Sequence, residues 1–313
     1  MRKKITIVGA GRVGSTTAFL CFTKELGNIV IWNRTSKLAK GIALDISESA
    51  PLTDSDVSII GTNDYKKTMG SDVIVITAGS QRKKGMSRDD LLELNVKIVK
   101  DIVKNIVKYN KRAIIICVTN PLDAIALTTL KVSKFNKKRV IGMAGILDSS
   151  RFRSFIAKEL KVGVEDINAM VLGGHGDSMI PLISHANLNG VPLTSLLSKK
   201  KINKLVQHTR GAGAEIIKLE KSSAYYSTGY AITEMVESIV KNKRRIFPCS
   251  AFLNGEYNTK GIFMGVPVIL GENGIEKIIK LKLSPDEKKQ FKKSASHVQG
   301  LVKKIWQKNL LKA

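Results

Sequence analysis

The first half of the chain alternates short branched-aliphatic runs with stretches of helical periodicity. The runs are nearly continuous in Val and Ile, at residues 5–8, 29–32, 57–60, 73–76, 114–118 and 140–143. Continuous runs, rather than alternating ones, are typical of strands buried on both faces of a parallel sheet. The pattern therefore predicts a doubly wound α/β domain over residues 1–144.

The clearest helix is expected between the fourth and fifth runs, where apolar residues recur at helical spacing from Leu91 to Val107. Ser87, with Asp90 three residues later, is a capping-box pattern that marks its start. The segment before it, about residues 80–90, is then predicted to be an exposed loop that carries two arginines. Guanidinium groups there suit a lid over a bound acid, although surface charge is the ordinary interpretation in a basic chain.

After about residue 145 the pattern changes to strands mixed with longer helices. Helices are predicted at residues 149–160, 201–219 and 224–241, a strand at 167–172, and strand pieces within 179–193 around Asn189-Gly190. The runs 246–253 and 262–270, with Asn254-Gly255 between them, predict a hairpin. Ser284-Pro285-Asp286-Glu287 combines an N-cap, a first-turn proline and an acid, which predicts a last helix.

Composition fits a large folded protein with an unusual charge. The 313 residues are 43% hydrophobic, enough for a large core and about two domains, and 52 Lys+Arg against 26 Asp+Glu give a net charge of +26. The basic residues fall in short groups along the whole length, and aromatic residues are only 5%, so we interpret the charge as solvated surface. A basic nucleic-acid-binding protein on an inactive scaffold is the alternative from another class.

The sequence also indicates a location. Residues 1–4 lead directly into a strand-like run, without the apolar segment and cleavage site of a signal peptide, and no uncharged stretch is long enough to span a bilayer. Cys21, Cys117 and Cys249 lie apart inside apolar segments, as buried reduced thiols do. We expect a soluble cytoplasmic protein with no membrane partner and no metal site.

A glycine-rich turn follows the first predicted strand. Gly9, Gly11 and Gly14, with Arg12 and Val13 among them, have the GxGxxG spacing between that strand and a helical segment. In this context backbone amides at a helix N-terminus face a pyrophosphate. The turn therefore predicts a Rossmann-type dinucleotide-binding domain, followed by an α+β catalytic domain over residues 145–313.

The end of the second predicted strand bears on the choice of dinucleotide. An Asp or Glu is expected here to bind the adenosine ribose, but the chain has Asn33 followed by Arg34, Thr35 and Ser36. An amide does not repel a 2′-phosphate, and the three residues after it carry donors. The sequence thus favours NADP(H), and NAD(H) with Asn33 on the ribose stays the alternative.

A histidine among small residues is the strongest candidate for catalysis. His175 lies within Gly173–Ser178, directly after a predicted strand, and an imidazole there can exchange a proton near pH 7. Asp148 offers a carboxylate that could hold the ring, and Arg151, three residues later on a helix, could bind an anion. Together they suggest a hydride-transfer site, whereas a lone histidine could equally be structural.

Several blocks occur in one order along the chain, and together they resemble the malate/lactate dehydrogenase family, within it the lactate-dehydrogenase-like malate dehydrogenases. The blocks are residues 9–14, 77–79, 82–92, 118–123, 147–153 and 173–178. The resemblance implies a homo-oligomer, tetramer or dimer, that interconverts malate and oxaloacetate with a nicotinamide dinucleotide. A lactate or other 2-hydroxyacid dehydrogenase on the same scaffold is the alternative.

The resemblance also implies roles for single residues. By it His175 is the acid/base, Asp148 orients the ring, and Arg151 binds the substrate's C1 carboxylate. Arg88 would polarise the carbonyl, and Arg82 would meet the second carboxylate, where lactate dehydrogenases carry glutamine. Further contacts are implied for Asn120 with substrate and cofactor, and for Asn95 and Val118 with the cofactor.

Overall fold

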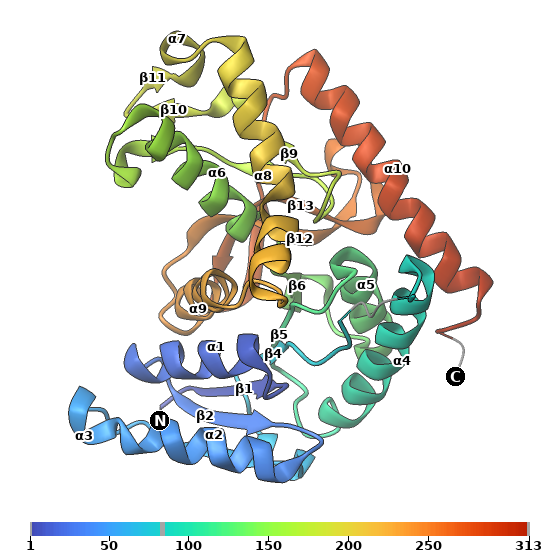
Figure 1. Ribbon diagram of the computed structural model, residues 1–313. Helices are drawn as coiled ribbons and strands as arrows, with labels where there is room; N and C mark the ends of the chain where they lie inside the picture. Colours follow the sequence, from blue (N-terminus) through green and yellow to red (C-terminus); the bar gives the residue numbers. More distant parts are fainter. Residues whose placement is uncertain (1, 82–84, 312–313) are drawn as a thin grey trace.

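The computed structural model describes residues 2–81 and 85–311 and is built on one large sheet (Figure 1). Within the described residues, six parallel strands have the order β3-β2-β1-β4-β5-β6. This is the doubly wound arrangement predicted from the apolar runs. The strands are β1 Lys4–Val8, β2 Asn28–Trp32, β3 Ile59–Thr62, β4 Val73–Ile76, β5 Ile114–Cys117 and β6 Val140–Gly142.

Helices cover the sheet and complete the first half. The longest, α4, begins at Arg88, and both hydrogen bonds of the predicted capping box between Ser87 and Asp90 are present. In space α1 packs on α9, and α4 packs on α5. The helices of this half are α1 Arg12–Thr23, α2 Ser36–Glu48, α3 Ala50–Thr53, α4 Arg88–Ile106 and α5 Leu122–Ser133, with 3-10 turns η1 Tyr65–Thr68 and η2 Lys137–Arg139.

The second half adds helices and small sheets around an antiparallel hairpin. The helices are α6 Gly145–Leu160, α7 Leu193–Leu196, α8 Lys199–Glu220, α9 Tyr226–Val240 and α10 Pro285–Gln307, with 3-10 turns η3 Val164–Asp166, η4 Ile183–His185 and η5 Glu256–Asn258. The strands are β7 Ile167–Asn168, β8 Val171–Leu172, β9 Ile180–Pro181, β10 Asn187–Leu188, β11 Val191–Pro192, β12 Arg245–Asn254, β13 Lys260–Gly271 and β14 Gly274–Ile278. The capping box of α10 and the β12–β13 hairpin are as predicted.

The hairpin is not separate from the first half. Strand β12 pairs with β6 where Ser250 lies opposite Gly142, so β12, β13 and β14 extend the central sheet. A Cβ on Gly142 would come within 2.7 Å of the Ser250 Cβ, so a glycine permits this close approach. The division of the chain at residue 144 stays a prediction, because the sheet is continuous across it.

Three predicted elements are corrected. The expected strand 167–172 is two strands in different sheets, β7 and β8, because the chain leaves one ladder at Ala169 before it enters the next. Strand β3 pairs with β2 only from Ile59, two residues later than predicted. Helix α6 begins at Gly145 instead of residue 149, and its N-cap, Ala144, gives no side-chain hydrogen bond that a sequence pattern could reveal.

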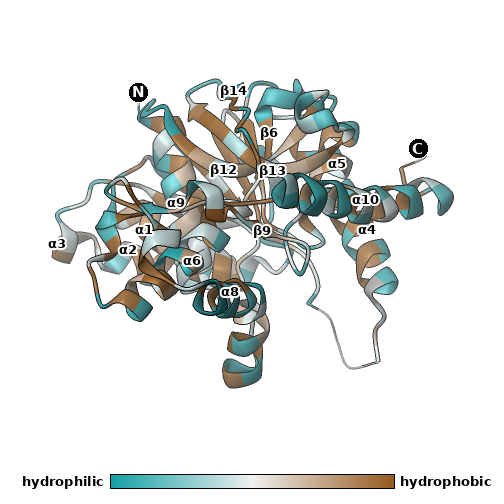
Figure 2. Ribbon diagram, turned by 90° about the horizontal axis from the view of Figure 1, so that it is seen from above, coloured by the Kyte–Doolittle hydropathy of each residue, from teal (hydrophilic) through white to brown (hydrophobic). Residues whose placement is uncertain are grey.

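Burial follows the hydropathy pattern. Figure 2 shows brown apolar strands at the centre and teal polar faces on α8 and α10. All three cysteines are buried and free, as predicted, and burial raises the pKa of the Cys21 and Cys117 thiols to about 12. In the described part of the chain, no helix has the length and apolar character needed to cross a bilayer.

Candidate active site

Three predicted site segments lie at one edge of the sheet. The glycine turn follows β1, the 77–81 segment follows β4, and Val118–Asn120 follows β5. These strands are parallel neighbours, so their carboxyl ends point to the same edge. The strand order also reverses between β1 and β4, which is where open α/β sheets bind ligands.

The glycine turn has the shape that a pyrophosphate requires. Gly9 has a φ of +117°, which favours glycine, and a Cβ on Gly14 would collide with the Gly9 carbonyl oxygen. At Gly11 a Cβ would meet, apart from its two chain neighbours, no atom of the described residues within 4 Å, so this side of the turn has room for a ligand. Gly11 is also the N-cap of α1, whose first turn contains no acidic residue. The residues present therefore fit a dinucleotide.

The end of β2 lies beside this turn. Asn33 Oδ1 accepts a hydrogen bond from the Ala10 main-chain N–H at 3.3 Å, and its Nδ2 donates to the Thr35 carbonyl at 3.2 Å. The Asn33 amide thus ties β2 to the glycine turn. Arg34 is exposed at the N-terminus of α2, whose first turn contains no acid.

The two predicted asparagines have different surroundings. Asn95 is only 1% exposed, and its amide bonds the main chain of Ser80 twice and the Asn120 carbonyl oxygen at 2.7 Å. It therefore joins the segments after β4 and β5. Asn120 is exposed, and its Oδ1 accepts from the Leu122 N–H at 3.3 Å. Val118, half-buried, continues β5 through a main-chain bond to Ile76.

His175, Asp148 and Arg151 come together in the folded chain, and the pairing of Asp148 with Arg151 follows their spacing on the helix. The early start of α6 places Asp148 in its first turn, 1% exposed. The His175 Nδ1 lies 2.9 Å from Asp148 Oδ2, and Arg151 Nη1 donates to Asp148 Oδ1 at 3.3 Å. The Nε of Arg151 is buried without a hydrogen-bond partner in the described structure. One carboxylate thus holds both the imidazole and the guanidinium.

Electrostatics favour the charged imidazole. Burial by itself lowers the pKa of His175, but the charge of Asp148 and its hydrogen bond outweigh burial, so the pKa is raised above its ordinary value. The His175 side chain keeps 16% of its surface exposed. With Nδ1 on Asp148, the other ring nitrogen, Nε2, is the one that can exchange a proton with a ligand.

The loop that carries His175 is held by residues the sequence reasoning missed. Gly173 exchanges two main-chain hydrogen bonds of 2.9 Å with Gly265 of β13. Ser294 of α10 accepts from the Gly174 N–H at 2.9 Å, and Asp123 of α5 accepts from the His175 N–H at 3.1 Å. Asp123 stands inside the 118–123 block, but nothing local to that block reveals its contact with His175.

The predicted lid loop, about residues 80–90, includes residues that the structure does not describe. Arg82 lies outside the described residues, and so does the side chain of Arg88, although Arg88 begins α4. Helix α10 lies beside the start of α4 (Figure 1). There Lys304 Nζ donates to both carboxylate oxygens of Asp89, at 2.6 Å to Oδ1 and 2.8 Å to Oδ2.

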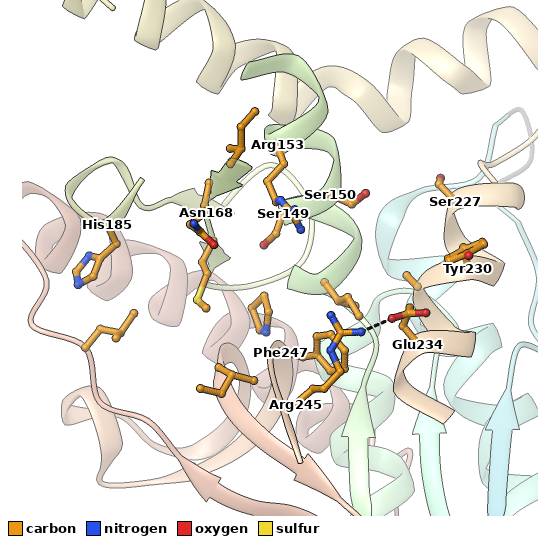
Figure 3. A pocket seen from close by; sticks show the side chains of 18 residues that line it. Ser149, Ser150, Arg153, Asn168, His185, Ser227, Tyr230, Glu234, Arg245 and Phe247 are labelled. Carbon is orange, nitrogen blue, oxygen red and sulfur yellow. Dashed lines mark hydrogen bonds and ion pairs between the residues drawn. The ribbon is translucent and has the colours of Figure 1, made fainter. Parts of the chain in front are cut away.

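A cavity of about 640 Å³ lies on the other face of α6 (Figure 3). Ser149 and Arg153 line it from α6, with Tyr230 of α9 and Phe247 of β12 across from them. Residues 149 and 153 point away from 148 and 151 on a helix, so this cavity is separate from the His175 cluster. Among the described residues, no group of three or more His, Cys, Asp or Glu side chains could hold a metal ion.

Known proteins match nearly the whole length of the chain. A family profile described as lactate/malate dehydrogenase, NAD binding domain, matches residues 3–142, and one described as lactate/malate dehydrogenase, alpha/beta C-terminal domain, matches residues 146–308. A malate dehydrogenase of Bacillus israeli is 48% identical over 307 residues, which cover 97% of this chain and 98% of the relative.

Solved structures of malate and lactate dehydrogenases have the same fold as this chain. The malate dehydrogenase of Cryptosporidium parvum superposes with a TM-score of 0.95 at 40% identity, covering 98% of this chain and 100% of that one. A lactate dehydrogenase of the same organism, complexed with lactic acid and nicotinamide adenine dinucleotide, gives a TM-score of 0.94 at 39% identity, covering 100% of this chain and 99% of that one. The fold alone therefore does not separate the two substrates.

Proposed function

The chain belongs to the lactate/malate dehydrogenase family, and from this premise we propose that it is a malate dehydrogenase, which interconverts malate and oxaloacetate with a nicotinamide dinucleotide. The bonded cluster of His175, Asp148 and Arg151 carries the proposal, because it joins an acid/base to an anion-binding group. Sequence identities of 48% and 49% to malate dehydrogenases, over 97% and 96% of this chain, favour malate over lactate as the substrate.

In this mechanism the protein binds the acid, moves one proton and excludes water. During oxidation, neutral His175 accepts the hydroxyl proton of malate at Nε2, while Asp148 keeps Nδ1–H in place and stabilises the imidazolium. During reduction, protonated His175 returns that proton to the carbonyl oxygen. The bound nicotinamide supplies the acceptor or donor of the hydride at C2.

Substrate binding falls to arginines in our proposal. Arg151 already donates to Asp148 through Nη1, and its side chain keeps 14% of its surface exposed, so a further guanidinium N–H can meet the C1 carboxylate. We assign Arg88 to the carbonyl and Asn120 to the substrate hydroxyl or carbonyl oxygen. Arg82 would pair with the second carboxylate, which pyruvate lacks.

The assay that tests this proposal compares substrates. We expect kcat/KM for oxaloacetate to exceed that for pyruvate by about 100-fold or more, because an unpaired guanidinium in a closed site costs several kcal/mol. In Arg82→Gln the oxaloacetate value should fall by about 100-fold while relative use of pyruvate rises. The exposed Arg112→Gln is the control. A wild-type preference for pyruvate would establish the lactate dehydrogenase alternative instead.

For the cofactor we propose NADP(H), held by the glycine turn and by the end of β2. The Asn33 amide is neutral, Arg34 is exposed beside it, and no acid occupies the first turn of α2. A 2′-phosphate would therefore meet donors and no repelling carboxylate. Backbone amides of residues 9–14, including those of Arg12 and Val13, would face the pyrophosphate, and Asn95, Val118 and Asn120 would border the nicotinamide half.

Asn33→Asp tests the cofactor proposal. The new carboxylate would stand beside the 2′-phosphate, so kcat/KM with NADPH should fall about 10- to 100-fold relative to NADH, since like charges in contact cost several kcal/mol. Asn28→Asp makes the same change at the opposite end of β2 and should leave the ratio unchanged. If wild type already uses NADH better than NADPH, Asn33 binds the ribose of NAD and the proposal is wrong.

We also propose a cytoplasmic homo-oligomer, dimer or tetramer, without a specific nucleic-acid or membrane partner. Exposed leucines on α2 and α3 support association: Leu38 is 49%, Leu44 60% and Leu52 87% exposed. The free, buried thiols suit a reducing compartment. The basic residues fall in short groups along the whole length, α8 and α10 included, a distribution that gives weak and salt-sensitive attraction to any polyanion.

A further inference from the structure

An arginine in the glycine turn stands where a helix start disfavours a positive charge. Arg12 is the only charged residue within residues 9–14 and the first residue of α1, directly after the N-cap Gly11. The helix dipole stabilises anions at this end and destabilises cations. The first turn of α1 contains no acid, and among the described residues no carboxylate pairs with the exposed Arg12 side chain. A cation that opposes the dipole here points to an anionic ligand.

The Arg12 guanidinium lies over an aromatic ring from the second half of the chain. Its Cζ is 5.2 Å from the centre of the Tyr225 ring, within the range of a cation–π contact. Tyr225 is the N-cap of α9, a position that favours Ser, Thr, Asp or Asn, and its side chain forms no capping hydrogen bond. Two residues that are both unsuited to a helix start thus contact each other, which suggests a role outside helix formation.

Close packing of α1 and α9 supports this contact. The two helices lie side by side (Figure 1). A Cβ on Gly229 of α9 would come within 2.7 Å of Thr16 Cγ2 of α1, so a glycine permits the close approach. The Tyr225 carbonyl oxygen accepts a hydrogen bond from the Gly229 N–H at 2.8 Å. The start of α9 is therefore held against α1, which keeps the Tyr225 ring within reach of Arg12.

We propose that the Arg12 side chain binds the pyrophosphate of the dinucleotide and that Tyr225 is a positioning residue that holds the guanidinium in place. This role is additional to that of the backbone amides of the glycine turn. It rests on the dinucleotide site of the proposed function, but not on the choice of substrate or of 2′-phosphate. NADP(H) and NAD(H) carry the same pyrophosphate, and a guanidinium can pair with two phosphate oxygens through parallel N–H groups.

The test is the binding of ADP and of adenosine, measured by calorimetry. ADP carries two phosphate groups but neither the nicotinamide nor the 2′-phosphate, and adenosine carries no phosphate. We expect Arg12→Gln to raise the Kd for ADP by about 10-fold, the low end for a hydrogen bond between charged groups because the side chain is exposed. The Kd for adenosine should change by less than about twofold. NADPH and NADH, followed by their fluorescence, should lose about the same factor as ADP.

Variants of Tyr225 test its positioning role. Tyr225→Phe keeps the ring and should leave the Kd for ADP within about twofold, whereas Tyr225→Leu should raise it by about threefold. In the Arg12→Gln protein, Tyr225→Leu should cause no further loss, because the two side chains act as a unit. Additive losses would mean that Tyr225 acts independently of Arg12 and would overturn its positioning role. If Arg12→Gln does not fold, the contrast between Tyr225→Phe and Tyr225→Leu decides the question.

Arg139→Gln is the matched control. The Arg139 Cζ also lies over an aromatic ring, 4.6 Å from the centre of Phe135, but in η2 directly before β6, at the opposite edge of the sheet. This variant should leave the Kd for ADP within about twofold. A rise equal to that in Arg12→Gln would reflect the loss of any positive charge and would overturn the proposal.

Stability without ligand distinguishes a binding role from a structural one. Removing a cation from the start of α1 should leave the Tm of ligand-free Arg12→Gln unchanged or raise it. A lower Tm with an unchanged Kd for ADP would make the contact of Arg12 with Tyr225 purely structural. A wild type that binds neither ADP nor a dinucleotide would contradict the proposed cofactor site itself. Equal ADP binding by wild type and Arg12→Gln would contradict only the role of Arg12.

Discussion

Replacing Asp148 by asparagine is expected to lower kcat for oxaloacetate reduction by about 10³- to 10⁴-fold, as in other His-carboxylate pairs. The amide can present an N–H to Nδ1 and so favour the wrong tautomer, and it no longer stabilises the imidazolium. Dinucleotide binding, followed by NADPH or NADH fluorescence, should stay near normal because the glycine turn is untouched.

The control for this change is Glu159→Gln on the same helix, where an exposed carboxylate pairs with Lys201. It should leave kcat within about twofold, since exposed ion pairs contribute little. A kcat loss below about tenfold in Asp148→Asn would show that the His175 pair is structural.

The same substitution has a stability signature. The pKa of His175 is raised in the folded state, so protonated His175 stabilises the fold fully below its ordinary pKa, and this contribution is lost as pH rises through the folded-state pKa. Asp148→Asn removes most of it. The difference in Tm between wild type and variant should therefore narrow from pH 6 to pH 9, and a constant difference would argue against the raised pKa.

Changing Arg151 to lysine should lower kcat/KM for oxaloacetate by about 100-fold or more, mostly through KM, although the charge is kept. A lysine ammonium cannot pair with Asp148 and also offer a second, parallel edge to a carboxylate. The neighbouring Arg153 supplies the control, because it points away from His175 and bonds the Val164 carbonyl oxygen at 3.1 Å. Arg153→Lys should change kcat/KM by less than about threefold. Equal losses in both variants would mean that Arg151 supports α6 and does not bind substrate.

Local features of this chain were predictable from sequence because local physics determines them. The apolar runs of β1 and β4, the glycine turn and the capping boxes at Ser87 and Ser284 depend on neighbours within one turn or one strand. The pairing of Asp148 with Arg151 is of the same kind, since residues three apart on a helix share a face. Helix α6 has no side-chain cap at its start, and the predicted helix therefore began four residues too late, at residue 149 instead of Gly145.

The sequence by itself thus determined the α/β class, the glycine turn of the dinucleotide-binding domain and the choice of His175, Asp148 and Arg151 as candidate site residues. Only the tertiary structure decided how the His175 loop is held, because its supports come from far along the chain: Asp123 is 52 residues from His175, Ser294 is 120 from Gly174, and Ser250 is 127 from Asp123. Buried polar groups must find hydrogen-bond partners, but which partner is in reach depends on how the sheet closes on β12. Sequence spacing does not predict these contacts, so the groups that surround His175 can be identified only from the folded structure.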